Sequence, residues 1–226
     1  MSDDRHVINA LPPVVSALCL LAVAVELTLS AGQAGLVGGP TAIGWRLAAI
    51  QDYAISPAVV DYVLGQGAVE PDLLKRFVTY PFVHASFTQA LFGAALLLAL
   101  GKFVGEVFHP AATGAVFFGS GIFGAVVYGL VAQGPVPLIG LFPPDYGLIG
   151  AFTYILWGRM GAAGQNQLAA FRLIGFLLGL QLLFGVVFGG GLEWVAELAA
   201  FVFGFAVSTV LAPGGWSALL DRLRQR

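Results

Sequence analysis

The sequence has few of the residues that a soluble, secreted or metal-binding domain needs. Charged residues make up 10% of the 226 positions, against about 25% in a typical soluble domain. The single cysteine, Cys19, excludes an internal disulfide framework and a zinc site of two or more thiolates. Three histidines and no basic stripe argue against a metal centre and against nucleic-acid binding. We expect no metal and no cofactor.

What the sequence does contain is apolar: 58% of its residues are hydrophobic. This composition predicts an all-α integral membrane protein with one domain spanning residues 1–226. A long connection at 32–77 is amphipathic in places, which favours short interfacial helices there. Six membrane spans are predicted, at residues 11–31, 78–101, 111–132, 146–160, 168–189 and 193–212.

The fourth apolar segment is unusual because the loop before it is apolar and rich in proline. Pro135, Pro137, Pro143 and Pro144 each lack a backbone donor and disfavour a helix. The predicted helix at 146–160 has about 15 residues, or roughly 22 Å, which is less than a bilayer core of about 30 Å. We therefore expect a short, sunken fourth helix whose loop dips into the membrane beside protein or a cavity.

The distribution of lysine and arginine predicts the orientation. With six spans and a cytoplasmic N-terminus, seven of the ten basic residues fall on the inside, as the positive-inside rule requires. Both termini are then cytoplasmic, the loop at 32–77 faces outward, and the expected location is a bacterial inner membrane. The seven inside residues are Arg5, Lys102, Arg159, Arg172, Arg222, Arg224 and Arg226.

The last predicted span carries a stripe of small residues at four-residue spacing. Such stripes let helix backbones approach closely in lipid, where burying apolar area provides little driving force. We expect this face of the last helix to meet a close neighbour, the fourth helix. The stripe consists of Ala196, Ala200, Gly204 and Ser208.

Three stretches in order along the chain resemble the motifs of the rhomboid family of intramembrane serine proteases. Residues 76–84 (RFVTYPFVH), followed by Gly101 and Glu106, resemble the second rhomboid span; residues 147–150 (GLIG) stand at the G-x-S-G of the fourth. Residues 196–204 (AELAAFVFG) resemble the A-H-x-x-G/A-F-x-x-G of the sixth. A Trp-Arg pair at 45–46 also resembles one in the first rhomboid loop.

The resemblance implies the rhomboid fold without its chemistry. Rhomboids use a serine on the fourth helix and a histidine on the sixth, but here these positions hold Ile149 and Glu197. Ile149 has no nucleophilic atom, so the carboxylate has nothing to activate. The oxyanion-stabilising positions would be Gln89 and Gly93, of which only Gln89 has a side-chain donor. We expect no proteolysis from this site.

The leading interpretation is a pseudoprotease that binds transmembrane segments of client or partner proteins, as inactive rhomboid relatives do. Two alternatives stay open: a structural subunit of a larger membrane complex, and an active intramembrane protease with unorthodox residues such as Thr153. Membrane lipids and partner helices are the expected partners, with access between the second and fifth spans. The candidate cavity residues are His84, Gln89, Tyr146, Gly147, Gly150 and Glu197.

Two acidic residues inside predicted spans need partners, because an ionisable group in a membrane costs a few kcal/mol or more. Glu197 lines a water-filled cavity if one persists at the former active site, or lies in the interface if its helix begins late. Glu26 is expected to bond Gln181 or a hydroxyl of a neighbouring span. For His84, we expect the ring to hydrogen-bond loop backbone.

Overall fold

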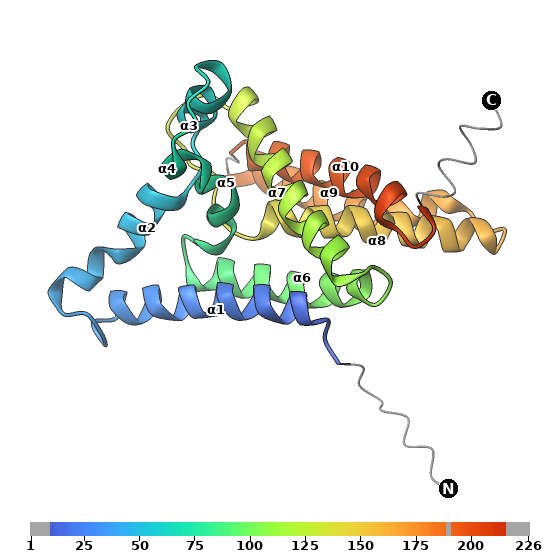
Figure 1. The fold of residues 1–226 in the computed structure, drawn as a ribbon, viewed down its shortest axis with the longest axis horizontal. Coiled ribbons are helices and arrows are strands. Elements are labelled where there is room, and N and C mark those ends of the chain that lie inside the picture. Colours follow the sequence, from blue (N-terminus) through green and yellow to red (C-terminus); the bar gives the residue numbers. More distant parts are fainter. Residues whose placement is uncertain (1–9, 189–190, 216–226) are drawn as a thin grey trace, which may run out of the picture.

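The computed structural model describes residues 10–188 and 191–215. The described residues form an all-α bundle in which successive long helices run in alternating directions (Figure 1). The first long helix starts, and the last one ends, on the same side of the bundle. The long helices are α1 (Pro13–Gln33), α6 (Phe87–Gly105), α7 (Pro110–Val131), α8 (Phe142–Ala162), α9 (Arg172–Phe188) and α10 (Glu193–Leu211).

The protein is an integral membrane protein by the character of these helices. Within the described ranges, α1, α6, α7 and α10 are each long and apolar enough to cross a membrane. Helices α8 and α9 lie on the same side of the bundle as α10 (Figure 1). The predicted span at 168–189 ends at a residue outside the described ones.

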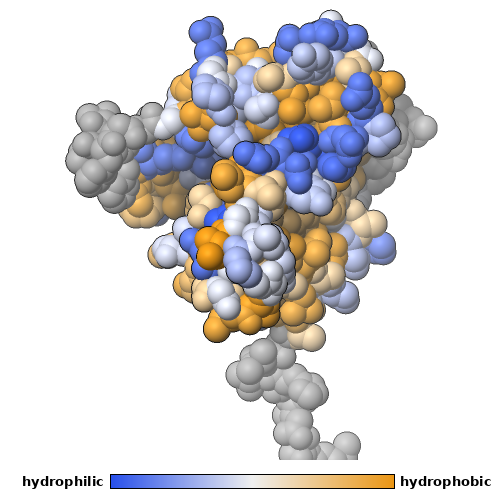
Figure 2. All heavy atoms as spheres, turned by 90° about the vertical axis from the view of Figure 1, so that its left-hand side faces the viewer, coloured by the Kyte–Doolittle hydropathy of each residue, from blue (hydrophilic) through white to orange (hydrophobic). Residues whose placement is uncertain are grey.

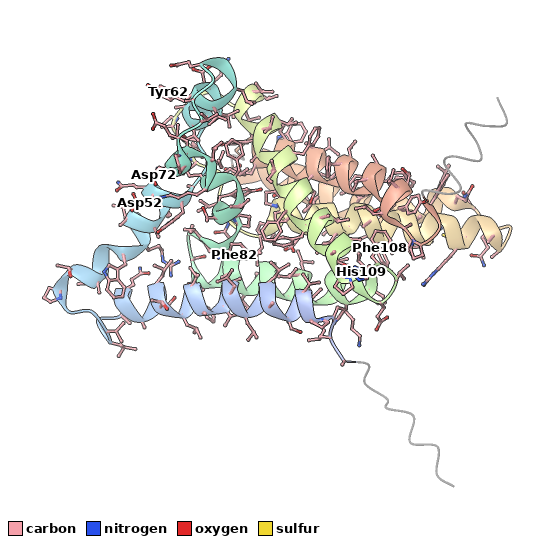
Figure 3. The ribbon with its side chains drawn as sticks, viewed as in Figure 1. Asp52, Tyr62, Asp72, Phe82, Phe108 and His109 are labelled. Atoms are coloured by element: carbon pink, nitrogen blue, oxygen red, sulfur yellow. The ribbon has the colours of Figure 1, made fainter. Side chains whose placement is uncertain are left out.

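The first loop folds into short helical pieces at one end of the bundle, as its amphipathic sequence predicts. Figure 2 faces this end and shows hydrophilic residues gathered on it between apolar ones. Asp52 and Asp72 are exposed there (Figure 3). The pieces are η1 (Pro40–Gly44), α2 (Trp45–Tyr53), α3 (Pro57–Val60), η2 (Asp61–Gly65), α4 (Pro71–Leu74), α5 (Arg76–Thr79) and η3 (Tyr80–Phe82).

The second long helix begins later than the sequence predicted, at Phe87 instead of residue 78. Pro81 lies in the short η3 turn, and Ser86 then caps α6 by accepting a hydrogen bond from the Gln89 backbone N–H at 3.2 Å. A serine in extended conformation with this bond is a strong helix start. Residues 83–86 therefore form a link between η3 and α6 that turns inward. Just before this link, the ring centroid of Phe82 (Figure 3) lies 6.2 Å from that of Phe117.

Helix α8 is longer than predicted, with 21 residues from Phe142 to Ala162. At 1.5 Å per residue it measures about 31 Å, so this helix is not short. The prediction erred because Pro143 and Pro144 occupy the first turn, where a backbone N–H has no partner within the helix and proline is tolerated. The loop before α8 is fixed by an antiparallel bridge in which Ile55 and Leu138 exchange backbone hydrogen bonds at 3.2 and 2.7 Å.

Candidate functional site

Helices α8 and α10 cross at unusually close range, and glycines make this possible. A Cβ atom added at Gly204 would overlap the Gly147 carbonyl, and one added at Gly150 would overlap the Phe201 carbonyl. On the far side of the crossing, Gly147 lies against the Ser120 side chain of α7. The backbones touch directly, which fixes how the first turns of α8 and α10 face each other.

The small-residue stripe of α10 forms this contact. Ala196, Ala200 and Ser208 are fully buried, and α10 packs most extensively on α8 and α7. A Cβ at Gly124 of α7 would approach the Ala196 carbonyl at 2.6 Å, so α10 is held closely on both sides. The Ser208 hydroxyl donates to the Gly204 carbonyl at 2.6 Å and so offers no free hydroxyl.

Ile149 and Glu197 lie on the two crossing helices but in different surroundings. Ile149 is completely buried in the main apolar core. Glu197 is 4% exposed, and the Tyr146 and Gln181 side chains line the same cavity beside it. Its Oε2 atom has no partner among the described residues. Ile149 therefore presents a hydrocarbon side chain to the core and offers no hydroxyl that the Glu197 carboxyl group could activate.

Glu197 lines a cavity of about 270 Å³ whose lining residues come from α6, α8, α9 and α10. Its polar groups come from Tyr146, Gln181 and Glu197, which belong to α8, α9 and α10. Its apolar walls are Leu96, Phe142, Leu177 and Leu180. A mostly apolar cavity with a few polar groups can accept a side chain from another protein segment.

The two candidate oxyanion positions do not reach this cavity. A Cβ at Gly93 would lie 2.9 Å from the Cβ of Leu141, so the fully buried Leu141 occupies the space beside this glycine. The Gln89 side-chain oxygen accepts a hydrogen bond from the Ala85 backbone N–H at 2.8 Å. Gln89 therefore helps to cap α6, and it is not among the residues that line the cavity.

His84 also lies away from the cavity, and its ring does not act as the sequence suggested. The residue is fully buried, and both ring nitrogens lack a hydrogen-bond partner within the described part of the chain. Burial lowers the pKa of His84 to about 4, so the ring is neutral at physiological pH. Its contribution to the network around it comes from its backbone carbonyl, which accepts from Arg46 at 2.7 Å.

Arg46 is the centre of a second polar cluster, at the C-terminal end of α1. Its guanidinium binds both carboxylate oxygens of Glu26, at 2.7 and 3.0 Å. It also donates to Ser30 at 3.1 Å, to Gln33 at 3.1 Å and to the His84 carbonyl. All five guanidinium N–H groups thus have an acceptor. Glu26 is paired with Arg46 of the first loop, whereas the expected partner Gln181 lies beside Glu197 instead.

The geometry can be compared with known proteins at this point. The family model of the rhomboid domain matches residues 71–214, which is more than half of the chain. The chain belongs to the rhomboid family. No curated protein matches the sequence. The matched region includes the crossing of α8 and α10, the cavity and the link from η3 to α6.

Within this rhomboid domain, the structure identifies two polar residues that sequence reasoning missed at the site. Gln181 joins Glu197 in the cavity. Asp145, one residue before Tyr146, is fully buried with neither carboxyl oxygen bonded to a described residue. A polar residue in the first turn of an otherwise apolar helix was the available signal for Asp145. Gln181, in contrast, was weighed as a partner for the wrong glutamate.

The chemistry open to the site follows from its atoms. Thr153, the unorthodox catalytic candidate, is fully buried, and its hydroxyl has no hydrogen-bond partner among the described residues. Thr153 is not part of the cavity lining, and a substrate carbonyl in the cavity would not meet it. The described residues contain no group of three or more histidine, cysteine or acidic side chains able to hold a metal ion.

Proposed function

We propose that this rhomboid-family protein is catalytically inactive and binds transmembrane segments of other membrane proteins. The observation that carries the proposal is the pairing of a buried hydrocarbon at Ile149 with a cavity whose carboxylate is incompletely bonded. Hydrolysis of a peptide bond by this fold needs an activated nucleophile. Recognition needs only the cavity and access to it from the membrane.

The structure supports binding through the position of the opening. The cavity lies between α6 and α9, and its walls on both helices are leucines that a membrane segment can pack against. Interhelical hydrogen bonds and close packing drive association in lipid. Glu197 and Gln181 supply polar groups at the inner end of an otherwise apolar opening. This arrangement is suited to holding one side chain of a passing helix.

The test is a parallel assay of labelling, cleavage and capture in proteoliposomes. The wild-type protein is incubated with a fluorophosphonate serine probe and a rhomboid transmembrane substrate, beside an active rhomboid and its serine-to-alanine variant. We expect no labelling and no cleavage. A photo-crosslinking amino acid at Leu177, which lines the cavity, is expected to capture transmembrane peptides.

A matched variant of the same chain checks the scaffold. Ile149→Ser with Glu197→His restores the residue types of the family's dyad. Labelling of this double variant alone would show that the wild type is silent because it lacks these groups. Labelling or cleavage by the wild-type protein would contradict the proposal, and mapping the labelled residue would locate the nucleophile.

A further inference from the structure

Two buried polar atoms of the cavity have no hydrogen-bond partner among the described residues, Glu197 Oε2 and Gln181 Oε1. The Tyr146 side chain lies beside them in the same cavity. An ionised carboxyl group and an amide oxygen both accept hydrogen bonds, so a donor satisfies both atoms. Leaving such atoms unsatisfied in a membrane costs free energy, which a bound donor would recover.

The size of the cavity limits what can supply the donor. A volume of about 270 Å³ equals that of about nine waters at roughly 30 Å³ each. This space fits one long side chain and excludes a whole helix. The backbone N–H groups of a helix are also bonded internally, so a helical client must donate from a side chain.

The depth of the acceptors restricts where the donor can sit. Glu197 is four residues from the start of α10, and Tyr146 is four residues from the start of α8. At 1.5 Å per residue, both lie about 6 Å along their helices, at the same end of the bundle (Figure 1). A donor level with the first turns of α8 and α10 reaches them, whereas one level with the middle of these helices does not.

We infer that the cavity selects transmembrane segments that carry a side-chain hydrogen-bond donor, above all lysine or arginine, at the level of the first two turns of α8 and α10. The inference rests on the proposed function and specifies its client. A basic side chain in a membrane is itself costly without a partner. Pairing this side chain with Glu197 therefore lowers the cost of burying both groups, whereas an acidic side chain of a client would be repelled by Glu197.

The experiment uses five synthetic transmembrane helices of leucine and alanine in nanodiscs with the full-length protein. Four carry lysine, glutamine, aspartate or leucine at one position near the cavity end, and the fifth carries lysine at its centre. The protein carries a photo-crosslinking residue at Leu180, which lines the cavity. We expect about three- to tenfold more capture of the end-lysine helix than of the leucine helix, intermediate capture of glutamine, and least of aspartate.

Variants locate the selectivity. Glu197→Leu and the isosteric Glu197→Gln are expected to remove the preference for lysine while still capturing the leucine helix. The control Glu106→Gln changes an exposed carboxylate at the opposite end of the bundle and should keep the preference. An unchanged unfolding midpoint of Glu197→Gln shows that the loss is not misfolding.

The outcomes separate the two proposals. Equal capture of all helices, a preference for aspartate, or equal capture of the end and central lysines would overturn this inference while leaving client binding intact. Capture of no helix by a folded protein would overturn both. A lysine preference that survives Glu197→Gln and Glu197→Leu would assign selectivity elsewhere and also overturn the inference.

Discussion

Two glutamates lie inside membrane helices, and the fold bonds the carboxyl group of one fully but that of the other only in part. Glu26 and Glu197 are 2% and 4% exposed, so burial does not distinguish them. Both carboxylate oxygens of Glu26 bind the Arg46 guanidinium. Glu197 has no cationic partner among the described residues, and its Oε2 is unbonded there. One carboxylate is fully bonded within the described part of the chain, whereas the other keeps an unbonded oxygen there.

The difference follows from what surrounds each residue. The Arg46 cluster ties α1 to the first loop and to the link before α6, so its bonds hold separate segments together. The Glu197 group lies at a crossing already held by direct backbone contact between α8 and α10. Bonds to Glu197 are not needed to hold these helices. An incompletely bonded carboxylate that the fold does not require is the expected signature of a binding site.

The largest expected effect on stability comes from removing the cation of the Arg46 cluster. Arg46→Gln removes the cation and leaves Glu26 buried without an opposite charge, which is expected to cost about 3–5 kcal/mol. The measurement is the free energy of unfolding in detergent micelles. The control Lys75→Gln removes an exposed ion pair with Asp72 and should change stability little.

A double variant tests whether the cost of Arg46→Gln comes from the buried charge that it leaves unpaired on Glu26. Glu26→Leu with Arg46→Leu removes both charges and is expected to be more stable than Arg46→Gln, because no buried charge is left alone. If Arg46→Gln cost no more than Lys75→Gln, the cluster would not be holding the first loop to the bundle.

The sequence predicted this architecture better than its polar contacts. Apolar segments and the ordered motifs predicted an all-α membrane protein of the rhomboid family, which the family match confirms. The pairing of Glu26 with Arg46 joins residues 20 positions apart on a helix and a loop, and one sequence has no periodicity that reports such a contact. The start of α8 was missed because proline is a helix breaker in general but not in a first turn.

The candidate site was predicted only in part, for a geometric reason. Tyr146 and Glu197 line the cavity as expected, while Gly147 and Gly150 serve the helix crossing. His84 lies on the link before α6, and Gln89 lies in the first turn of α6 with its side chain bonded back to Ala85 of that link. Motif positions give the helix of each residue, but the direction of a side chain depends on where the helix begins.

The next effect tests the close crossing that positions Glu197 and Tyr146. Gly204→Leu places a side chain where the Gly147 backbone lies, and overpacking of this kind is expected to cost about 1–3 kcal/mol. The control is Gly158→Ala in the same helix pair, where an added Cβ meets nothing within 4 Å and the better helix former stabilises. Unchanged unfolding of Gly204→Leu would contradict the direct backbone contact.

A smaller effect on stability is expected from a change of pH, because the buried ring of His84 titrates. Burial lowers the pKa of His84 to about 4, below the ordinary value near 6.5. The unfolded chain therefore takes up the proton first on acidification, and stability is lost as pH falls from about 6.5 toward 4. The expected loss at pH 5.5 is about 1.4 kcal/mol relative to pH 8.

The measurement compares unfolding of the wild type and His84→Leu at pH 8 and pH 5.5. Taking the difference between the two proteins removes the contribution of other titrating groups. The stability advantage of the wild type should shrink at the lower pH by that amount. An advantage that stays constant, or grows on acidification, would show that the ring is already protonated or bonded in the fold.

The smallest effect on stability is expected at Glu197, and the same substitution at Glu26 provides the comparison. Glu26→Gln weakens charge-assisted hydrogen bonds to Arg46 and is expected to cost about 1.5–3 kcal/mol. Glu197→Gln keeps the shape and removes a charge that has no cationic partner in the described chain, so we expect a change in unfolding free energy within about 0.5 kcal/mol. Both variants are measured in the same detergent. A loss at Glu197 equal to that at Glu26 would show that the fold already satisfies Glu197, and the difference between the two carboxylates would then disappear.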